Sequence, residues 1–266
     1  MPNLSIGLRI AFRSRFGWLA GSSLFLMTLA AYLSAQFSGR HPGTVAMDVG
    51  LSVIRLILPL VVVLITQEVL SREFDRRYYL NSLSCPHPRH NLLLGRFLSI
   101  ALLTFGLLIV LAASLALLVW AVTLDYTQST PTNLGALFLI TVTFIGIDLL
   151  VLTTVATLLA VVASTSSFVL VGTLGFMLVA RSFGAIIELL TNNTGLVGDA
   201  ESYRSRVGLL GYLVPDLGAL DIRMITLYGR IEFLPPDWPW LILSNLVYAV
   251  GLLSLAIWAL QHKRFA

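Results

Sequence analysis

The chain has 266 residues, of which 57% are apolar and only 11% are charged. A soluble domain carries about 25% charged residues, so this composition excludes an ordinary soluble protein and, with its long apolar runs, indicates a membrane protein. The net charge of +4 comes from basic residues that flank apolar runs, which points to orientation in a bilayer rather than to nucleic-acid binding. We therefore expect no nucleic acid among the partners. A single cysteine, Cys85, excludes an internal disulfide.

Six apolar segments are long enough to cross a bilayer as helices, since a hydrocarbon core of about 30 Å requires roughly 20 helical residues. The third and fourth segments exceed that length, so we expect them to tilt or to extend beyond the hydrocarbon. The predicted fold is an all-α polytopic membrane protein with a single transmembrane domain over residues 1–266. Its predicted spans cover residues 17–37, 51–71, 92–122, 134–163, 167–190 and 239–261.

Basic residues cluster in three regions that six spans would place on the same side of the membrane. These regions lie before the first span, between the second and third spans, and after the last span. By the positive-inside rule this side is cytoplasmic, so both termini are expected in the cytoplasm and residues 38–50, 123–133 and 191–238 on the opposite side. The basic residues concerned are Arg9, Arg13, Arg15, Arg72, Arg76, Arg77, Arg89, Arg96, Lys263 and Arg264.

Two segments outside the spans have a pattern of their own. Residues 3–16 place apolar and basic side chains on opposite helical faces, which predicts an interfacial helix; a basic N-terminus that serves only as an orientation signal is the alternative. Residues 207–233 are apolar but interrupted by Pro215, Gly218 and Gly229. They are too broken for a spanning helix and predict short re-entrant helices before the last span.

Ionisable residues inside the spans are costly and are therefore candidates for function. Asp148 lies near the middle of the fourth span without a partner in its own helix, so it must face another helix or a water-filled path. A role in a substrate path and a role as a buried hydrogen-bonding residue both stay open. Arg55 lies about one turn into the second span from the outer side, so its side chain can reach the interface, and a structural or anchoring role is favoured over a functional one.

Two further charged pairs have structural interpretations. Arg181 and Glu188 are seven residues apart on one face of the fifth span, where pairing through water or with neighbouring helices is favoured over a functional role. Glu68 precedes Arg72 by four residues, a spacing at which an ion pair at the interface is expected. The candidates for a translocation path are thus Asp148, Arg55, Arg181 and Glu188.

The sequence contains no motif for nucleotide or metal chemistry that we can identify. A GxxxxGK[ST] phosphate loop is absent, as are the HExxH and GxSxG motifs. Cys85, His87 and His90 lie close together, but two prolines stiffen this stretch and its spacing fits no standard zinc site. A rigid turn is the better interpretation. We expect no catalytic residue, cofactor or metal in this chain.

The most informative stretch is the charged segment over residues 71–96, SREFDRRYYLNSLSCPHPRHNLLLGR, between the second and third spans. Much of it is compatible with one short helix that mixes aromatic and charged side chains. Such a surface suits docking of a soluble protein as well as contact with lipid headgroups. A solvated connector is the alternative.

In layout, the chain resembles the permease subunits of type-2 ATP-binding-cassette (ABC) exporters. In that family an interfacial helix precedes six spans, and the loop between spans two and three carries an acidic-basic segment, a coupling helix and a Pro-containing turn. The stretches Ser71–Arg77, Leu80–Leu83, Pro86 and Leu94–Arg96 are similar to that series. The Cys-Pro-His-Pro sequence at 85–88 departs from it.

The resemblance implies a pair of permeases, expected to be a homodimer in a bacterial inner membrane, each bound to a cytoplasmic ABC ATPase that supplies the ATP and Mg²⁺ sites. Membrane lipids and accessory membrane or periplasmic proteins are further expected partners. The 72–90 loop would transmit the motion of the ATPase, and the turn at 164–167 would make a second contact. The coupling residues that the resemblance implies are Arg72, Glu73, Asp75, Arg76, Arg77, Tyr78, Leu80 and Leu83.

Two other functions stay open from the sequence. One is a membrane signalling or mechanical-coupling protein driven by an ABC ATPase without transport. The other is an ion-coupled secondary transporter, for which a single mid-membrane acid, Asp148, gives little support. The transported substrate is not encoded in any motif that we recognise.

Overall fold

The computed structural model describes Gly7, Arg9 and residues 16–71, 89–125, 134–163, 165–192 and 214–262. Within these ranges the chain is helical without a strand, and six helices are long and apolar enough to cross a membrane. The prediction of an all-α polytopic membrane protein is confirmed. The spanning helices are α2 (Phe16–Phe37), α3 (Pro42–Thr66), α6 (Arg89–Asp125), α7 (Ala136–Val162), α8 (Ser166–Asn192) and α11 (Trp238–His262).

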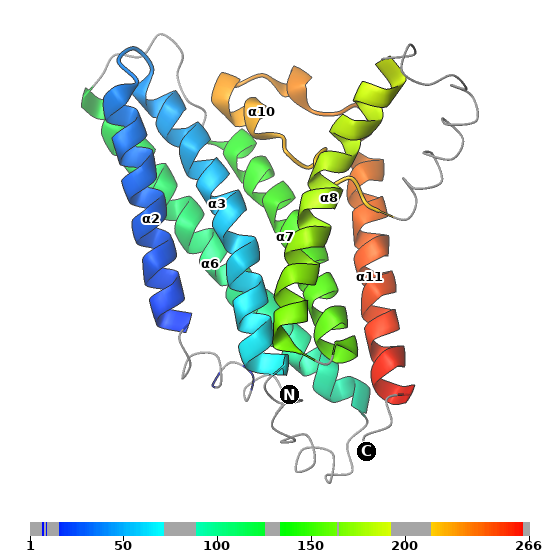
Figure 1. Ribbon diagram of the computed structural model, residues 1–266. Helices are drawn as coiled ribbons and strands as arrows, with labels where there is room; N and C mark the ends of the chain where they lie inside the picture. The colour runs from blue at the N-terminus through cyan, green and yellow to red at the C-terminus, as the bar shows by residue number, and fades with distance from the viewer. Residues whose placement is uncertain are drawn as a thin grey trace.

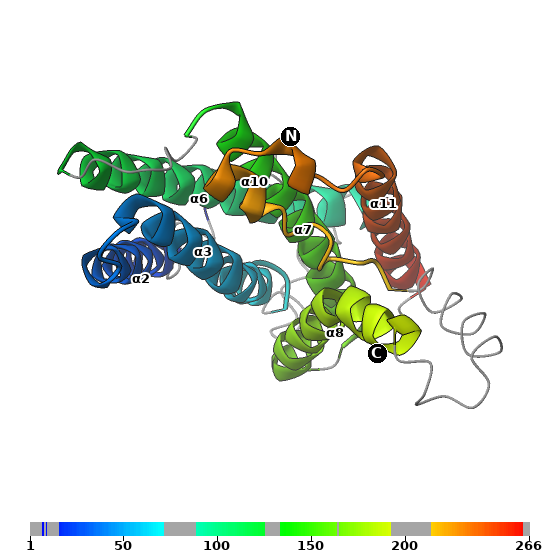
Figure 2. The same ribbon diagram turned by 90° about the horizontal axis from the view of Figure 1, so that it is seen from above.

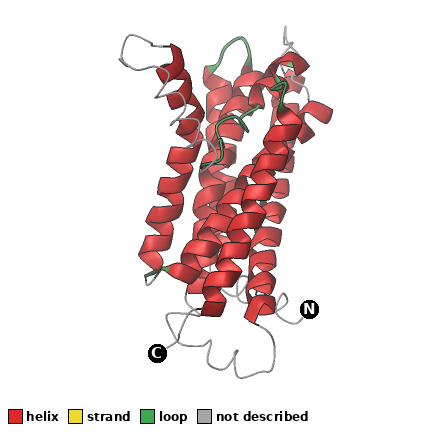
Figure 3. Cartoon of the chain, turned by 90° about the vertical axis from the view of Figure 1, so that its right-hand side faces the viewer, coloured by secondary structure: helices red, strands yellow, loops and turns green. Residues whose placement is uncertain are grey.

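Three helices, α3, α6 and α7, form the centre of the bundle (Figure 1). Helix α2 packs against α3 and α6 on one side, and α11 packs against α7 on the other. Helix α8 contacts α7 and α3 at the remaining edge, as the view from above shows (Figure 2). In the side view α8 lies at the margin of the bundle (Figure 3).

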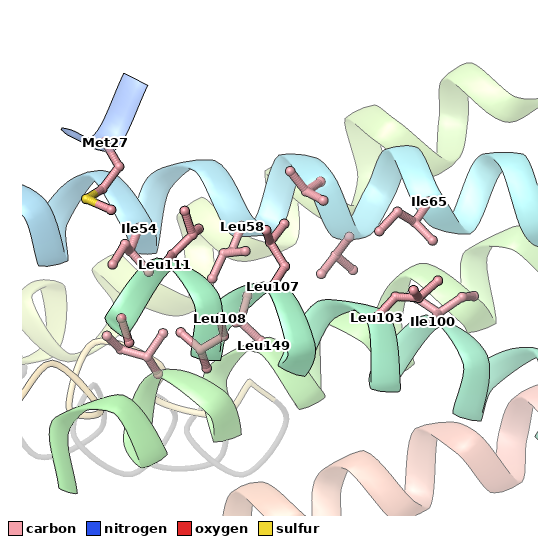
Figure 4. Close-up of a cluster of buried hydrophobic side chains, with 14 of the residues drawn as sticks. Met27, Ile54, Leu58, Ile65, Ile100, Leu103, Leu107, Leu108, Leu111 and Leu149 are labelled. Carbon is pink, nitrogen blue, oxygen red and sulfur yellow. The ribbon is translucent and has the colours of Figure 1, made fainter. Parts of the chain in front are cut away.

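The core is an apolar layer between α3, α6 and α7 (Figure 4). Side chains such as Leu58, Leu111 and Leu149 are almost fully buried there. Bilayer lipid is as apolar as these leucines, so close packing and satisfied polar groups, rather than burial from water, hold such helices together. Thr153 and Thr157 in α7 accordingly donate to carbonyls one turn earlier in their own helix.

The two ends of the bundle differ in what they carry. The start of α2, the end of α3, the start of α6, the α7–α8 turn and the end of α11 lie at one end, here called the terminal end (Figure 1). At the opposite end, residues 214–237 form a loop, the short helix α10 (Arg223–Tyr228) and the 3-10 turn η2 (Ile231–Phe233). Gly229 ends α10 in the left-handed region, at φ +66°, which favours glycine.

Two differences from the sequence prediction concern the second span. We predicted an outer loop over 38–50 and a span over 51–71, but α3 begins at Pro42. Proline suits the first helical position because it needs no hydrogen bond from its nitrogen, and it fixes the backbone angle that a helix requires. Beyond Thr66 the chain continues as a five-residue π-helical turn, η1 (Gln67–Ser71), instead of α-helix.

The short helices predicted before the last span correspond to α10 and η2. Three other predicted features lie outside the described residues: most of the interfacial helix at 3–16, the coupling helix with its turn, and residues 207–213. Arg72, the proposed partner of Glu68, is also outside them.

Candidate functional site

Six charged residues meet at the end of the bundle that carries α10. We call them the charged cluster. Three are acids and three are arginines, so the cluster balances its formal charge. They come from α3, α7, α8, α10 and the loop that precedes α10. The members are Asp48, Arg55, Asp148, Arg181, Asp221 and Arg223.

Asp148 lies at the bottom of the charged cluster, and its side chain is 0% exposed. Its Oδ2 atom accepts a hydrogen bond from Arg181 Nη2 at 2.5 Å and lies 3.6 Å from Arg55 Nε. Both arginine side chains are themselves largely buried, at 19% and 11% exposed. A carboxylate at this depth is stable only when it is paired, so these two contacts account for an acid in the middle of α7.

Arg55 connects the helices to the loop before α10. Its Nη1 atom lies 2.5 Å from Oδ2 of Asp221, and its Nη2 atom donates to the carbonyl of Leu217 at 2.7 Å. The sequence favours a structural or anchoring role for Arg55, with its side chain able to reach the interface; in the structure this side chain is only 11% exposed and contacts Asp148 and Asp221 instead. The reason is that α3 begins at Pro42, so Arg55 lies more than three turns inside the helix, with acids of α7 and the loop beside it.

The backbone of the loop is also held by α8. The amide of Leu217 donates to the carbonyl of Ala180 at 3.1 Å, and both residues are fully buried. Arg181 Nη1 in turn donates to the carbonyl of Arg55 at 3.1 Å, which joins α8 to α3. Residues 214–222 are therefore fixed to two different spanning helices through both side-chain and main-chain groups.

Arg223 forms the outer, half-exposed part of the charged cluster. It lies 3.2 Å from Asp48 and 3.4 Å from Asp221, and it donates to the hydroxyl of Ser52. Asp48, Ser52 and Arg55 follow one another at spacings of four and three residues, which places them on one face of α3. Helix α10 is thereby held over that face, and the hydroxyls of Thr226 and Thr141, 2.6 Å apart, hold it against α7.

A pocket of about 400 Å³ opens among these groups. It lies between α3, α8, the loop and α10, and three guanidinium groups but only one carboxylate line it. Asp148 is not among the lining residues but contacts two of them, Arg55 and Arg181. The lining residues are Ser52, Arg55, Leu56, Arg181, Gly218, Asp221 and Arg223.

Gly218 allows the loop to approach α8 closely. A Cβ atom at this position would lie 2.5 Å from the carbonyl oxygen of Arg181, which is backbone and cannot turn away. We expect Gly218→Ala to displace the loop and to destabilise the folded protein by about 1–3 kcal/mol, the usual cost of overpacking. Thermal unfolding in detergent measures this. Gly251→Ala is the matched control, because a Cβ there meets nothing within 4 Å; an equal loss in both variants would contradict the close approach.

Of the four translocation-path candidates, the structure brings three together. Asp148, Arg55 and Arg181 share one site, and Asp148 faces neighbouring helices as expected. The side chain of Glu188 lies outside the described part of the chain. So do the eight predicted coupling residues between Arg72 and Leu83.

Sequence reasoning did not identify Asp48, Ser52, Asp221 and Arg223 as site residues. Asp48 lies in the predicted outer loop over 38–50, and Asp221 and Arg223 lie in the predicted outer segment over 191–238, so none of them falls in a predicted span. The helical spacing of Asp48, Ser52 and Arg55 was the available signal. It becomes visible only once the helix is extended back to Pro42.

These features define a multi-pass membrane protein with a six-helix bundle. Buried ion pairs hold the loop at 214–222 and α10 against one end of this bundle. The family model described as ABC-2 family transporter protein matches residues 6–259, nearly the whole chain. The chain belongs to this family, so it is the transmembrane permease component of an ABC transporter. A search of curated proteins gives no significant match.

Proposed function

We propose that this chain is the permease subunit of an ATP-driven exporter, and that a separate cytoplasmic ATPase drives it through the 72–90 loop. The observation that carries the proposal is the charged cluster, which joins α3, α7 and α8 to the loop before α10 at the end of the bundle opposite η1 and the start of α6. Charges at membrane depth mark pathways and moving parts of transporters, because a purely structural helix contact does not require them.

The proposed orientation places the terminal end in the cytoplasm. The turn η1, the start of α6, the α7–α8 turn and the end of α11 all lie at that end, and the basic residues of the sequence flank the same helix ends (Figure 1). The positive-inside rule then puts the charged cluster on the far side of a bacterial inner membrane. An ATPase at one end would thus control access at the other.

The described residues suggest how motion passes from the coupling loop to α8. The π-helical turn η1 comes directly before residue 72, and such turns are weak points in a helix that often occur at functional sites. In this turn, Gln67 Nε2 donates to the carbonyl of Ser166, the first residue of α8, at 2.7 Å. Arg181 lies farther along the same helix. A displacement of η1 would therefore move α8 and the ion pair with Asp148 together.

In the proposed cycle two copies of the permease pair, and the path runs beside α3 and α8. The loop at 214–222 covers the outer end of this path while its ion pairs are intact. Closure of the ATPases shifts α3 and α8 relative to each other, and the loop is released from both helices. The cluster serves a gate better than a carrier site for protons, because each of its acids is already paired with an arginine.

Co-purification tests the proposal. The tagged full chain, expressed with the neighbouring genes of its source, should retain one ATPase subunit per permease through detergent extraction and size-exclusion chromatography. ATP hydrolysis of the retained complex should depend on lipid reconstitution. A permease that moves a substrate along an ion gradient in vesicles without any ATPase would contradict the proposal.

A further inference from the structure

We propose that the pocket in the charged cluster binds the phosphate or carboxylate headgroup of an anionic amphiphile, and that Asp221 is a built-in competitor for the same arginines. This inference rests on the proposed function and names the substrate class of that site. It is carried by the lining of the pocket, by the pairing of Asp221, and by the apolar surface that begins at the rim.

The lining favours an anion. Arg55, Arg181 and Arg223 reach the pocket wall, whereas Asp221 is the single acid in it. Two lining guanidinium groups have donors to spare among the described contacts: Nε of Arg181 is buried without a hydrogen-bond partner, and the described contacts of Arg223 use only its Nε and Nη1 atoms. Arginine forks match the oxygens of carboxylates and phosphates, and such charge-assisted hydrogen bonds are strong when partly buried.

Asp221 already shows how an anionic group is held here. One of its oxygens lies 2.5 Å from Arg55 Nη1 and the other 3.4 Å from Arg223 Nε. The carboxylate thus bridges two arginines that belong to α3 and α10. It sits on a loop, and its side chain is 30% exposed, so an incoming anion can take its place without entering the core. Exchange of the carboxylate for a ligand anion would free the loop from α3.

The rim of the pocket explains why the anion would carry an apolar tail. Leu56 lines the pocket, and its side chain is 60% exposed; Leu60, one turn farther along α3, is exposed as well. In the proposed path beside α3 and α8, these leucines offer an apolar surface to an acyl chain. A headgroup in the pocket can therefore leave its chain on Leu56 and Leu60, along the length of α3.

Lipid retention measured by native mass spectrometry tests this binding site without any ATPase. The full chain is purified in a neutral detergent with an equimolar mixture of phosphatidylglycerol and phosphatidylcholine. Arg223→Gln should lower the retention of phosphatidylglycerol by about tenfold, the loss of one charge-assisted hydrogen bond. Asp221→Asn should raise it, because it removes the competitor. Phosphatidylcholine retention should stay the same in all proteins.

Arg230→Gln is the matched control, since Arg230 is an exposed arginine near α10 outside the pocket. Equal losses for Arg223→Gln and Arg230→Gln, or a loss rather than a gain for Asp221→Asn, would overturn the proposal. Full displacement of the lipid by inorganic phosphate would show that the pocket binds an anion without an apolar tail, and would overturn the proposal that its ligand is an amphiphile. A negative result in the lipid experiment does not affect the co-purification of the ATPase, so the lipid proposal and the proposed function can be rejected independently.

Discussion

Arg181→Gln is expected to destabilise the folded protein by about 3–5 kcal/mol, the usual cost of removing one partner from a buried ion pair. The substitution removes the 2.5 Å contact from Arg181 to Asp148. It leaves a fully buried carboxylate with only Arg55 Nε, at 3.6 Å. The bond from Arg181 to the carbonyl of Arg55 is also lost, which removes a second link between α8 and α3. Thermal unfolding of the purified full chain in detergent measures the loss.

The double variant Arg181→Gln/Asp148→Asn separates charge from shape. It removes both charges and leaves an amide at each position, so no carboxylate stays buried without its partner, and we expect it to recover more than half of the lost stability. It should not recover coupled ATP hydrolysis, because the neutral pair no longer holds α8 through a charge. A double variant that is as unstable as Arg181→Gln would show that the contact between Arg181 and Asp148 is not the reason for the loss.

Charge reversal at Arg76 and Arg77 is expected to detach the partner ATPase from an otherwise folded permease. The proposed coupling segment carries these two basic residues, and two reversals change its charge by four units. Like-charge contact across an interface costs several kcal/mol and reduces the association rate. We expect ATPase retained in pull-downs to fall by about tenfold or more, with unfolding temperature unchanged.

Arg40→Glu combined with Arg230→Glu supplies the control for that experiment. It changes the charge by the same amount at residues that flank the opposite end of the bundle. This variant should keep its ATPase. Equal retention in both variants would place the coupling contact elsewhere on the chain.

Apolar length alone was sufficient to predict the spanning helices. Each of the six predicted spans corresponds to an observed helix, and most ends agree within three residues. The exception is the start of α3, where Gly43, Asp48 and Gly50 reduce the apolar character, so that nine helical residues were assigned to a loop. Helix continues there because Met47 and Leu51 bury their side chains in the core between α2, α3 and α6.

The partners of the buried charges could not be predicted from one sequence. That Asp148 must meet another helix followed from the cost of a lone carboxylate in a membrane. Its partners, Arg181 and Arg55, are 33 and 93 residues away, and only packing brings three helices to one point. The ion pair between Asp221 and Arg55 was even harder to predict, because it depends on a loop that folds back between α3 and α8.

A reversible cross-link between the loop and α8 tests most directly whether the loop at 214–222 is the gate of an ATP-driven path. Leu217 and Ala180 are neighbours through the bond between the Leu217 amide and the Ala180 carbonyl. The variant carries Cys at both positions and Ser in place of Cys85, and each single-Cys variant is its control. In the reconstituted complex, oxidation should lower ATP hydrolysis by about tenfold, because turnover requires the loop to move. A reductant should restore the rate. Equal rates in the fully cross-linked and reduced states would contradict the gate.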